Sequence, residues 1–265
     1  MTAARWIDLD GAENVRDLAG LPTADGQRIQ AGRLIRSDSL QELSPADVRR
    51  LVEEVGVRSV VDLRTGVEVR SERGGPMTKE PSVDIFHLSL FPEAGETTDA
   101  AVVDEDEPVV LPWHNEERSA VAERRGASGI YLRYLDDRAD SIVAALRVIA
   151  ESEGATIVHC AAGKDRTGVV IACALAEVGV TRDAIVDDYT RSAERIEAVY
   201  HRLGARRTYR DDLRGTDVDH HRPRARTMDR MLAAVDEIHG GIPAWLRAHG
   251  WTAQDAARLR QKLLG

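Results

Sequence analysis

The stretch TIVHCAAGKDRTGVV, Thr156–Val170, decides the fold because it runs from a strand-like segment through a compact turn into an apolar segment. Its first residues are β-branched and too few for a helix, which predicts a central strand that ends at Cys160. The apolar run TGVVIACALAEVG is typical of a buried helix that begins near Thr167 or Gly168 and ends at Gly179. Such a strand, turn and helix are the basic unit of an α/β protein, and the turn lies at the sheet edge where ligands usually bind.

The segments before this unit continue the alternation of strands and helices. RIQAGRLIRS, VRSVVDLRT and SVDIFHLSL predict strands. Between the first two, SPADVRRLVEEVG predicts a helix that is capped by Ser44 and Asp47 and stopped at Gly56. The first half of the chain therefore predicts several strands with a helix packed beside them.

The second half of the chain predicts mostly helices. Apolar residues spaced three, four and seven apart predict one helix over 129–151, whose buried face holds Leu135, Ile142, Leu146 and Ile149. Further helices are expected after Thr181 and over 225–239, 243–249 and 252–264, the last with Thr252 and Asp255 as a capping pair. The polar segment GARRTYRDDLRGTDVDHHRPRAR is expected to be a loop. We therefore expect an α/β fold with a central, mainly parallel twisted sheet flanked by helices.

Composition limits the class of protein. The 265 residues are 43% hydrophobic, which is enough for one large domain over residues 1–265. No run of 18 apolar residues occurs, so we expect no membrane span. The N-terminus has no apolar signal segment, which predicts a cytoplasmic protein or one exported without a Sec signal. A formal net charge of −9 argues against nonspecific binding of nucleic acid.

The cysteines and histidines do not form a metal-binding or disulfide pattern. Cys160 and Cys173 are too few for a disulfide scaffold and lack the Cys-x-x-Cys spacing of a zinc site. His220 and His221 are adjacent in a polar segment and lack the partners of a metal site. We therefore expect no bound metal.

Residues 91–128 interrupt the alternation of strands and helices. The segment contains prolines and, from Glu93 to Glu117, nine acidic residues without a lysine or arginine. It is either a disordered surface insertion or a mobile lid, for which Val109–Leu111 and Trp113 would supply an apolar docking patch. A polyanionic ligand would need a locally positive pocket elsewhere on the protein.

The turn after the central strand has the composition of an anion-binding loop. Ala161, Ala162 and Gly163 let the backbone curl tightly, so that successive N–H groups point inward, and the following helix adds its positive N-terminal dipole. Helix N-termini and nearby cations lower the pKa of a cysteine from near 8.5 to about 3.5–7.5. We therefore expect Cys160 to be a nucleophilic thiolate, whereas Cys173 fits a buried apolar position.

Polar side chains complete the expected site. Arg166 has a planar fork that can hold two phosphate oxygens, and Lys164 adds positive charge against a transferring phosphoryl group. Thr167 is expected to hydrogen-bond the sulfur, to cap the helix, or to do both. His159 lies on the opposite face of the strand from Cys160, so we expect it to fix the loop and support the thiolate.

Asp165 is the unexpected residue of this loop, since a carboxylate opposes the binding of an anion. A neighbouring like charge and partial burial would favour its protonated form. It could then protonate the leaving oxygen and later accept a proton from water. The alternative is a structural aspartate that pairs with a neighbouring arginine or caps the helix.

The loop His159–Gly168, HCAAGKDRTG, carries the Cys-x5-Arg-Thr signature of cysteine-dependent phosphatases. In this form it resembles the loop of the bacterial tyrosine-protein phosphatase family. Similar blocks extend over nearly the whole chain, namely NVRDLAG, GRLIRSDSL, VVDLRT, VDDYTRS and the C-terminal LRQKLLG. The resemblance therefore covers much more than the loop.

The resemblance implies a cysteine-phosphatase-like fold and hydrolysis of phosphate monoesters through a phosphocysteine at Cys160, without a metal or other cofactor. Arg166 would bind the phosphate, and Asp165 would be the general acid. Lys164 is similar to a lysine of phosphatases that act on phosphoinositides, so phosphorylated proteins and phosphoinositides are the implied substrates. The family's helical lid occurs in the part of the chain that holds residues 91–128.

Charged residues outside the loop allow two interpretations. Asp62 and Arg64 follow a strand and face the same edge of the sheet as the loop. There they either position the loop or the substrate, or they form a buried ion pair that holds two loops together. Arg16, Asp17 and Arg36 allow the same two interpretations.

Two other functions use a similar loop. A phosphate-binding module that has lost catalysis usually lacks the cysteine or the arginine, whereas this chain keeps both, together with Asp165 and Thr167. A sulfur-transfer or arsenate-reducing enzyme also uses a cysteine in an anion loop. Asp165 and the lack of a resolving cysteine beside the loop argue against it. The sequence thus favours a protein-tyrosine or dual-specificity phosphatase, with phosphoinositides as a second class of substrate.

Overall fold

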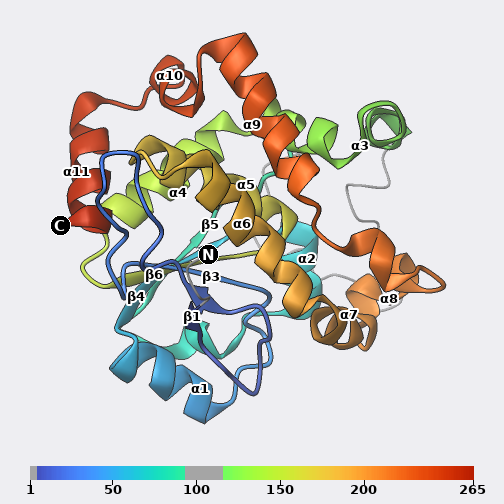
Figure 1. Ribbon diagram of the computed structural model, residues 1–265. Helices are drawn as coiled ribbons and strands as arrows, with labels where there is room; N and C mark the ends of the chain where they lie inside the picture. Colours follow the sequence, from blue (N-terminus) through green and yellow to red (C-terminus); the bar gives the residue numbers. More distant parts are fainter. Residues whose placement is uncertain (1–4, 93–115) are drawn as a thin grey trace.

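A six-stranded sheet forms the centre of the molecule in the computed structural model, which describes residues 5–92 and 116–265 (Figure 1). The strands are β1 (Arg5–Trp6), β2 (Arg16–Asp17), β3 (Leu34–Ser37), β4 (Val57–Asp62), β5 (Asp84–His87) and β6 (Ala155–His159). They lie in the order β1-β2-β3-β6-β4-β5. From β3 to β5 all neighbours are parallel, whereas β1 and β2 pair antiparallel at one edge. The expected α/β fold with a mainly parallel sheet is confirmed.

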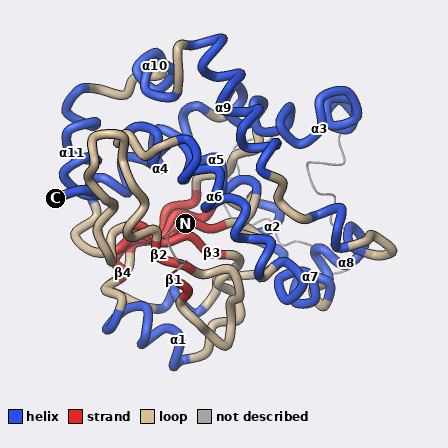
Figure 2. Tube along the Cα trace, in the orientation of Figure 1, coloured by secondary structure: helices blue, strands red, loops and turns tan. Residues whose placement is uncertain are grey.

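Helices cover both faces of this sheet. They are α1 (Pro45–Arg49), α2 (Gly66–Glu72), α3 (Glu116–Asp137), α4 (Ala139–Glu151), α5 (Asp165–Glu177), α6 (Arg182–Arg191), α7 (Ile196–Gly204), α8 (Arg207–Leu213), α9 (Ala225–His239), α10 (Ile242–Ala248) and α11 (Ala253–Leu264). Helices α4 to α6 and α9 to α11 lie over one face and α1 against the other, and Figure 2 shows the strands between these layers. None of the helices in the described ranges is long and apolar enough to cross a membrane.

The central strands are buried on both faces. On β6, Val158 packs into the cluster under α4 and α5, whereas Ile157 packs into the cluster that contains Leu51. On β4, Val61 packs into the cluster under α4 and α5, and Val60 packs into the cluster that contains Leu51. This double burial explains why these strands are nearly continuous apolar runs rather than alternating ones. It also fixes β6 at the centre, with Cys160 at the edge where the parallel strands end.

Helix boundaries follow the capping residues that the sequence contains. Ser44 and Asp47 form a reciprocal capping box at the start of α1, and Thr252 and Asp255 form another at α11. Gly56 ends the π-helical turn that extends α1 and has a φ of 77°, which a glycine adopts without steric cost. These expected boundaries are confirmed.

The expected single helix over 129–151 is wrong, because the chain breaks between α3 and α4 at Arg138. This residue has φ −137° and ψ 44°, and its guanidinium binds the Phe91 carbonyl and the Asp140 carboxylate. The bond to Phe91 holds the segment that follows β5 against α3 and α4. The apolar face was nevertheless identified correctly, since Leu135, Ile142, Leu146 and Ile149 are all buried.

The expected acidic insertion or lid over 91–128 lies largely outside the described residues, which exclude 93–115. Helix α3 begins at Glu116, within the last part of this segment. The sequence from Glu116 to Arg125 is mostly charged but rich in good helix formers, and its apolar residues Ala120–Ala122 are adjacent rather than spaced at helical intervals.

Two further boundaries differ from expectation. The polar segment after α7 is not simply a loop, because it forms α8, where Tyr209 is buried against Ala161 and Leu203. Tertiary burial of one aromatic side chain stabilises this short helix. Helix α5 begins at Asp165, two residues before the expected start at Thr167.

Candidate active site

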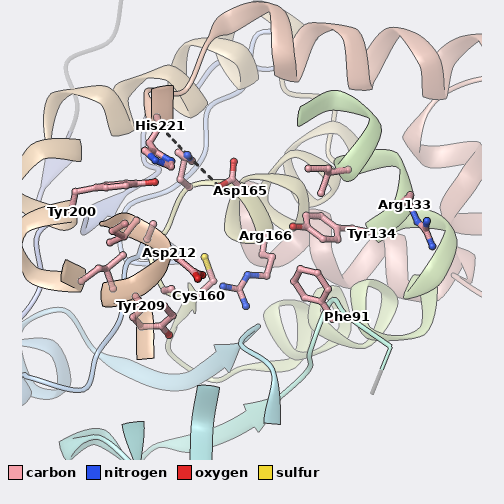
Figure 3. A pocket seen from close by; sticks show the side chains of 16 residues that line it. Phe91, Arg133, Tyr134, Cys160, Asp165, Arg166, Tyr200, Tyr209, Asp212 and His221 are labelled. Carbon is pink, nitrogen blue, oxygen red and sulfur yellow. Dashed lines mark hydrogen bonds and ion pairs between the residues drawn. The ribbon is translucent and has the colours of Figure 1, made fainter. Parts of the chain in front are cut away.

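Cys160 lies at the base of an open cavity of about 480 Å³ and not in a sealed interior. Strand β6 ends at His159 and α5 starts at Asp165, so Cys160 is the first residue of a tight loop between them. Figure 3 shows its sulfur beside the Arg166 side chain, with Tyr209 on one side and Phe91 on the other. Burial would lower the pKa of Arg166, but the charge of Glu68, with a smaller contribution from Cys160, raises it. Cys160 and Arg166 line one cavity, as the sequence led us to expect.

The loop is curled so that its carbonyl groups point outward. The Ala161 carbonyl accepts from the Ser39 N–H at 3.0 Å, and the Ala162 carbonyl accepts from Asn14 Nδ2 at 3.0 Å. The Gly163 carbonyl accepts from Arg36 Nη2 at 2.7 Å. In a trans peptide the N–H points opposite to the carbonyl, so the following N–H groups face the inside of the loop. The backbone therefore forms the anion nest that the small residues predicted.

Gly163 makes this curl possible. Its φ is 64°, and a Cβ at this position would lie 2.4 Å from the Ser37 carbonyl oxygen. Both the left-handed backbone and the close approach to β3 therefore require glycine. The loop is packed directly against the end of the neighbouring parallel strand.

Buried arginines hold the loop from behind. Asp188 on α6 binds Arg16 Nε at 2.9 Å and Arg36 Nη1 at 2.6 Å. Burial alone would raise the pKa of Asp188, but the charges of Arg16 and Arg36 outweigh it and lower the pKa. Asp17 does not join this group, since its carboxylate accepts from the Ala19 and Gly32 N–H groups. Arg16 and Arg36 thus position the loop.

Asp38, directly after β3, makes the free energy of unfolding depend on pH. Its carboxyl accepts from the Asn14 N–H at 2.9 Å, and burial raises its pKa from 3.8 to about 6. The folded protein therefore holds this proton more tightly than the unfolded chain. Because of this, ionisation of Asp38 lowers the free energy of unfolding as the pH rises from about 4 to about 6.

The variant Asp38→Asn removes this titration while keeping the hydrogen-bond acceptor. At about 1.4 kcal/mol per pKa unit, the free energy of unfolding of the variant relative to wild type should rise by roughly 3 kcal/mol between about pH 3.5 and about pH 6.5. Urea denaturation across this pH range measures the difference. A difference that stays constant with pH would contradict the assignment.

Arg166 is fixed by a carboxylate that the sequence did not indicate. Glu68 on α2 binds Arg166 Nη1 at 2.6 Å and Nη2 at 2.9 Å, and it is fully buried. It also accepts from the Thr65 N–H and from Tyr209 Oη. Burial would raise the pKa of Glu68, but the Arg166 charge and these hydrogen bonds lower it. A guanidinium has five donors, and Glu68 engages two of them.

Asp165 is held by Tyr131 and by Lys164. Tyr131 Oη donates to Asp165 Oδ1 and lies 2.8 Å from Tyr189 Oη. Burial and the Asp165 charge raise the pKa of Tyr131, so its hydroxyl keeps its proton and acts as a donor. Lys164 Nζ lies 3.3 Å from Asp165 Oδ2. These contacts fix the carboxylate at the rim of the cavity, where its side chain is 37% exposed.

Asp62 and Arg64 form a buried ion pair at 2.6 Å, but they lie two residues apart in one segment, so the pair does not join two loops as the second interpretation expected. Neither residue lines the cavity that contains Cys160. His159 is buried on the Asp62 side of β6, with Nε2 3.7 Å from Asp62 Oδ1. Burial lowers the pKa of His159, which favours the neutral imidazole. These three residues support the base of the loop from the face opposite Cys160.

Two expected contacts are absent from the described part of the chain. The buried Thr167 hydroxyl has no hydrogen-bond partner there, so the expected bond to the Cys160 sulfur is not formed. Thr167 also lies inside α5 and does not cap it.

The Lys164 ammonium donates to the His221 carbonyl at 2.7 Å, which ties the loop to the segment before α9.

Several cavity residues have no local signal in the sequence. Tyr200, Tyr209 and Asp212 come from α7 and α8, and Tyr134 comes from α3. Figure 3 shows Asp212 projecting into the cavity near Cys160, which makes it a second carboxylate at the site. Only Glu68 has a recognisable signature, since Thr65-x-x-Glu68 is a capping box, but that pattern predicts a helix start and not an arginine partner.

A parallel α/β sheet with a cysteine and an arginine in an anion-binding loop at its edge defines a cysteine-dependent phosphatase. The chain belongs to the tyrosine phosphatase family, whose model matches residues 7–265. This confirms the family to which the sequence was assigned.

Individual relatives cover nearly the whole chain. The triple specificity protein phosphatase PtpB of Mycobacterium tuberculosis is 29% identical over 280 residues, which covers 97% of this chain and 99% of that protein. A tyrosine-protein phosphatase of Nostoc commune is 27% identical over 265 residues, 98% of this chain and 83% of that protein. A solved core catalytic domain of the PP-IP phosphatase SIW14 from S. cerevisiae, in complex with citrate, is 14% identical. It matches 87% of this chain and 98% of its own with a TM-score of 0.38.

Proposed function

We propose that the protein hydrolyses phosphate monoesters by transferring the phosphoryl group first to Cys160 and then to water. One observation carries this proposal: Cys160 and Arg166 line one cavity, at a loop whose Ala161, Ala162 and Gly163 carbonyl groups are bound from outside. This geometry offers a nucleophile and a ring of N–H donors to the same phosphate group. Membership of the tyrosine phosphatase family supports the same chemistry.

In the first step the Cys160 sulfur attacks phosphorus, the S–P bond forms, and the P–O bond to the leaving group breaks. The loop N–H groups and Arg166 stabilise the charge on the three other phosphate oxygens. Asp165 donates a proton to the leaving oxygen. In the second step Asp165 takes a proton from water, the oxygen attacks phosphorus, and the S–P bond breaks to release phosphate and restore the thiolate.

The walls of the cavity favour an aromatic phosphate ester. Phe91, Tyr134, Tyr200, Tyr209 and Leu213 surround the approach to Cys160. A phosphotyrosine ring would bury apolar surface against them, and aromatic pairs add about 0.5–1.5 kcal/mol beyond this burial. We therefore propose phosphotyrosine as the preferred substrate, and phosphoserine, phosphothreonine and phosphoinositides as the wider range that the family resemblance implies.

The variant Asp165→Asn tests the proton-transfer role. We expect the kcat for phenyl phosphate, whose leaving group is poor, to fall by about 10²–10³-fold, because general acids contribute typically 10²–10⁴-fold. The kcat for an activated ester such as para-nitrophenyl phosphate should fall much less, since its leaving group needs no proton. Initial rates on both esters, with a chelator present, measure the effect.

Asp212→Asn is the matched control, because it removes the other carboxylate of the cavity. We expect it to change the rates on both esters by a similar and small factor. If instead Asp212→Asn selectively slows the poor leaving group, Asp212 is the acid and the role of Asp165 is wrong.

A second candidate function is a catalytically silent phosphate-binding module, and measurable turnover by wild type would exclude it. We also propose that residues 1–265 act as one phosphatase domain, because the loop after β6 and the helices α3, α7 and α8 each supply part of the cavity lining. A cytoplasmic location, or export without a Sec signal, stays a prediction from the N-terminal sequence.

A further inference from the structure

A second cavity, of about 320 Å³, lies on the other side of Lys164 and Asp165 from the Cys160 pocket. Both cavities are lined by these two residues, so they share one wall. Its other walls come from Tyr189, the segment before α9 and the first turns of α9. Its most conspicuous feature is the number of arginines, which are Arg222, Arg224, Arg226 and Arg230.

Three of these arginines have no counter-charge among the described residues. Arg222 is neutralised by Asp219 at 2.6 Å and by Glu197. Arg224, Arg226 and Arg230 are exposed and make no ion pair or side-chain hydrogen bond with residues 5–92 or 127–265. The protein has a formal net charge of −9. A cavity with three uncompensated guanidinium groups is therefore a positively charged site on an otherwise acidic protein.

The same arginines occupy positions that a helix disfavours. Arg224 is the N-cap of α9, the first turn contains no acidic residue, and no side chain caps the helix. Cations at this end oppose the helix dipole, which favours negative charge there. Arg226 and Arg230 are four residues apart, where like charges destabilise a helix by about 0.2–0.5 kcal/mol. A bound anion would turn each of these unfavourable charge interactions into a favourable one. Residues that disfavour the local structure occur most often at functional sites.

We propose that this cavity binds a second phosphate of the same substrate molecule, so that the enzyme prefers a doubly phosphorylated peptide. This inference rests on the proposed function of the Cys160 site. Arginine forks bind phosphate oxygens in pairs, which suits a phosphate dianion better than a single carboxylate. The second phosphate would lie against Arg226 and Arg230 while the phosphotyrosine enters the aromatic cavity.

The wall between the cavities favours a peptide over a phosphoinositide. The side chains of Lys164 and Asp165 separate the two cavities, so the two phosphates must lie on opposite sides of these side chains. An extended peptide advances about 3.3 Å per residue, so neighbouring phosphorylated residues can lie on either side of such a wall. The aromatic lining of the first cavity also suits a tyrosine ring better than an inositol ring.

The test compares a peptide that carries phosphotyrosine alone with the same peptide that also carries phosphoserine two residues away. For wild type we expect kcat/KM to be at least about tenfold higher for the doubly phosphorylated peptide, since charge-assisted hydrogen bonds are worth about 1.5–3 kcal/mol. The preference should decrease as the salt concentration rises. In the variant Arg226→Ala/Arg230→Ala the preference should be lost, whereas kcat/KM for the singly phosphorylated peptide should stay near wild type.

The variant Arg247→Ala/Arg258→Ala is the control, because it removes the same charge from α10 and α11, away from this cavity. It should keep the preference. Equal kcat/KM for the two peptides in wild type would overturn the inference while leaving the proposed function intact, and no turnover of either peptide would overturn the proposed function. A preference for a soluble inositol bisphosphate that depends on Arg226 and Arg230, and is absent for the peptides, would also overturn it.

Discussion

Replacing Cys160 with serine should lower kcat for aryl phosphates by about 10⁴-fold or more, the scale on which loss of a nucleophile is felt in enzymes. A serine hydroxyl is protonated at neutral pH, and the loop lacks a base that could activate it, because Asp165 is assigned to the leaving group. The inward N–H groups and Arg166 remain in the variant. We therefore expect inorganic phosphate to bind Cys160→Ser at least as well as wild type, measured by calorimetry.

Cys173 provides the control for this substitution. It lies within α5, is fully buried, and burial raises its pKa to about 12, so it is a neutral thiol. Cys173→Ala should lower the midpoint of thermal unfolding through a small cavity but leave kcat within a fewfold of wild type. Full activity of Cys160→Ser, or a loss of activity confined to Cys173→Ala, would refute the assignment of the nucleophile.

The second large effect is expected for Arg166→Lys, which should lower kcat by about 10²–10³-fold. Lysine keeps one positive charge but loses the planar fork, so it cannot bind Glu68 and phosphate oxygens together. The substitution also leaves the buried Glu68 without its bidentate partner. Unpaired buried charge is destabilising, so the midpoint of urea unfolding should fall as well.

Arg64→Lys separates these two consequences. Arg64 is buried and paired with Asp62, as Arg166 is with Glu68, but it does not line the cavity. We expect a comparable loss of stability and a much smaller loss of kcat. If both variants lose stability and kcat in the same proportion, Arg166 acts through the fold and not on the phosphate.

The local parts of the site were predictable from the sequence because they lie in one short segment. Cys160, Gly163 and Arg166 are fixed by the strand, the turn and the helix on either side of them, and the periodicity of these elements can be read directly. Their partners cannot be read in this way. Glu68 is 98 residues from Arg166, and Asp188 is 152 residues from Arg36, so only the folded sheet brings them together.

The wrong helix boundaries have the same origin. Helix α8 looks like a loop because its sequence is polar, and it is stabilised by Tyr209 packing against α7 and the loop between β6 and α5. The break between α3 and α4 depends on Arg138 reaching the Phe91 carbonyl, 47 residues away. In both cases a tertiary contact outweighs the conformational preference of the local sequence.

The central claim is that the Cys160 sulfur forms a bond to phosphorus, and trapping that bond tests it most directly. The protein is mixed with an aryl phosphate, quenched with acid during turnover, digested, and analysed by mass spectrometry. We predict that the peptide containing Cys160 gains the mass of one phosphoryl group, and that the peptide containing Cys173 does not. Continued turnover without a phosphorylated Cys160 peptide, or with the phosphoryl group on another side chain, would contradict the account.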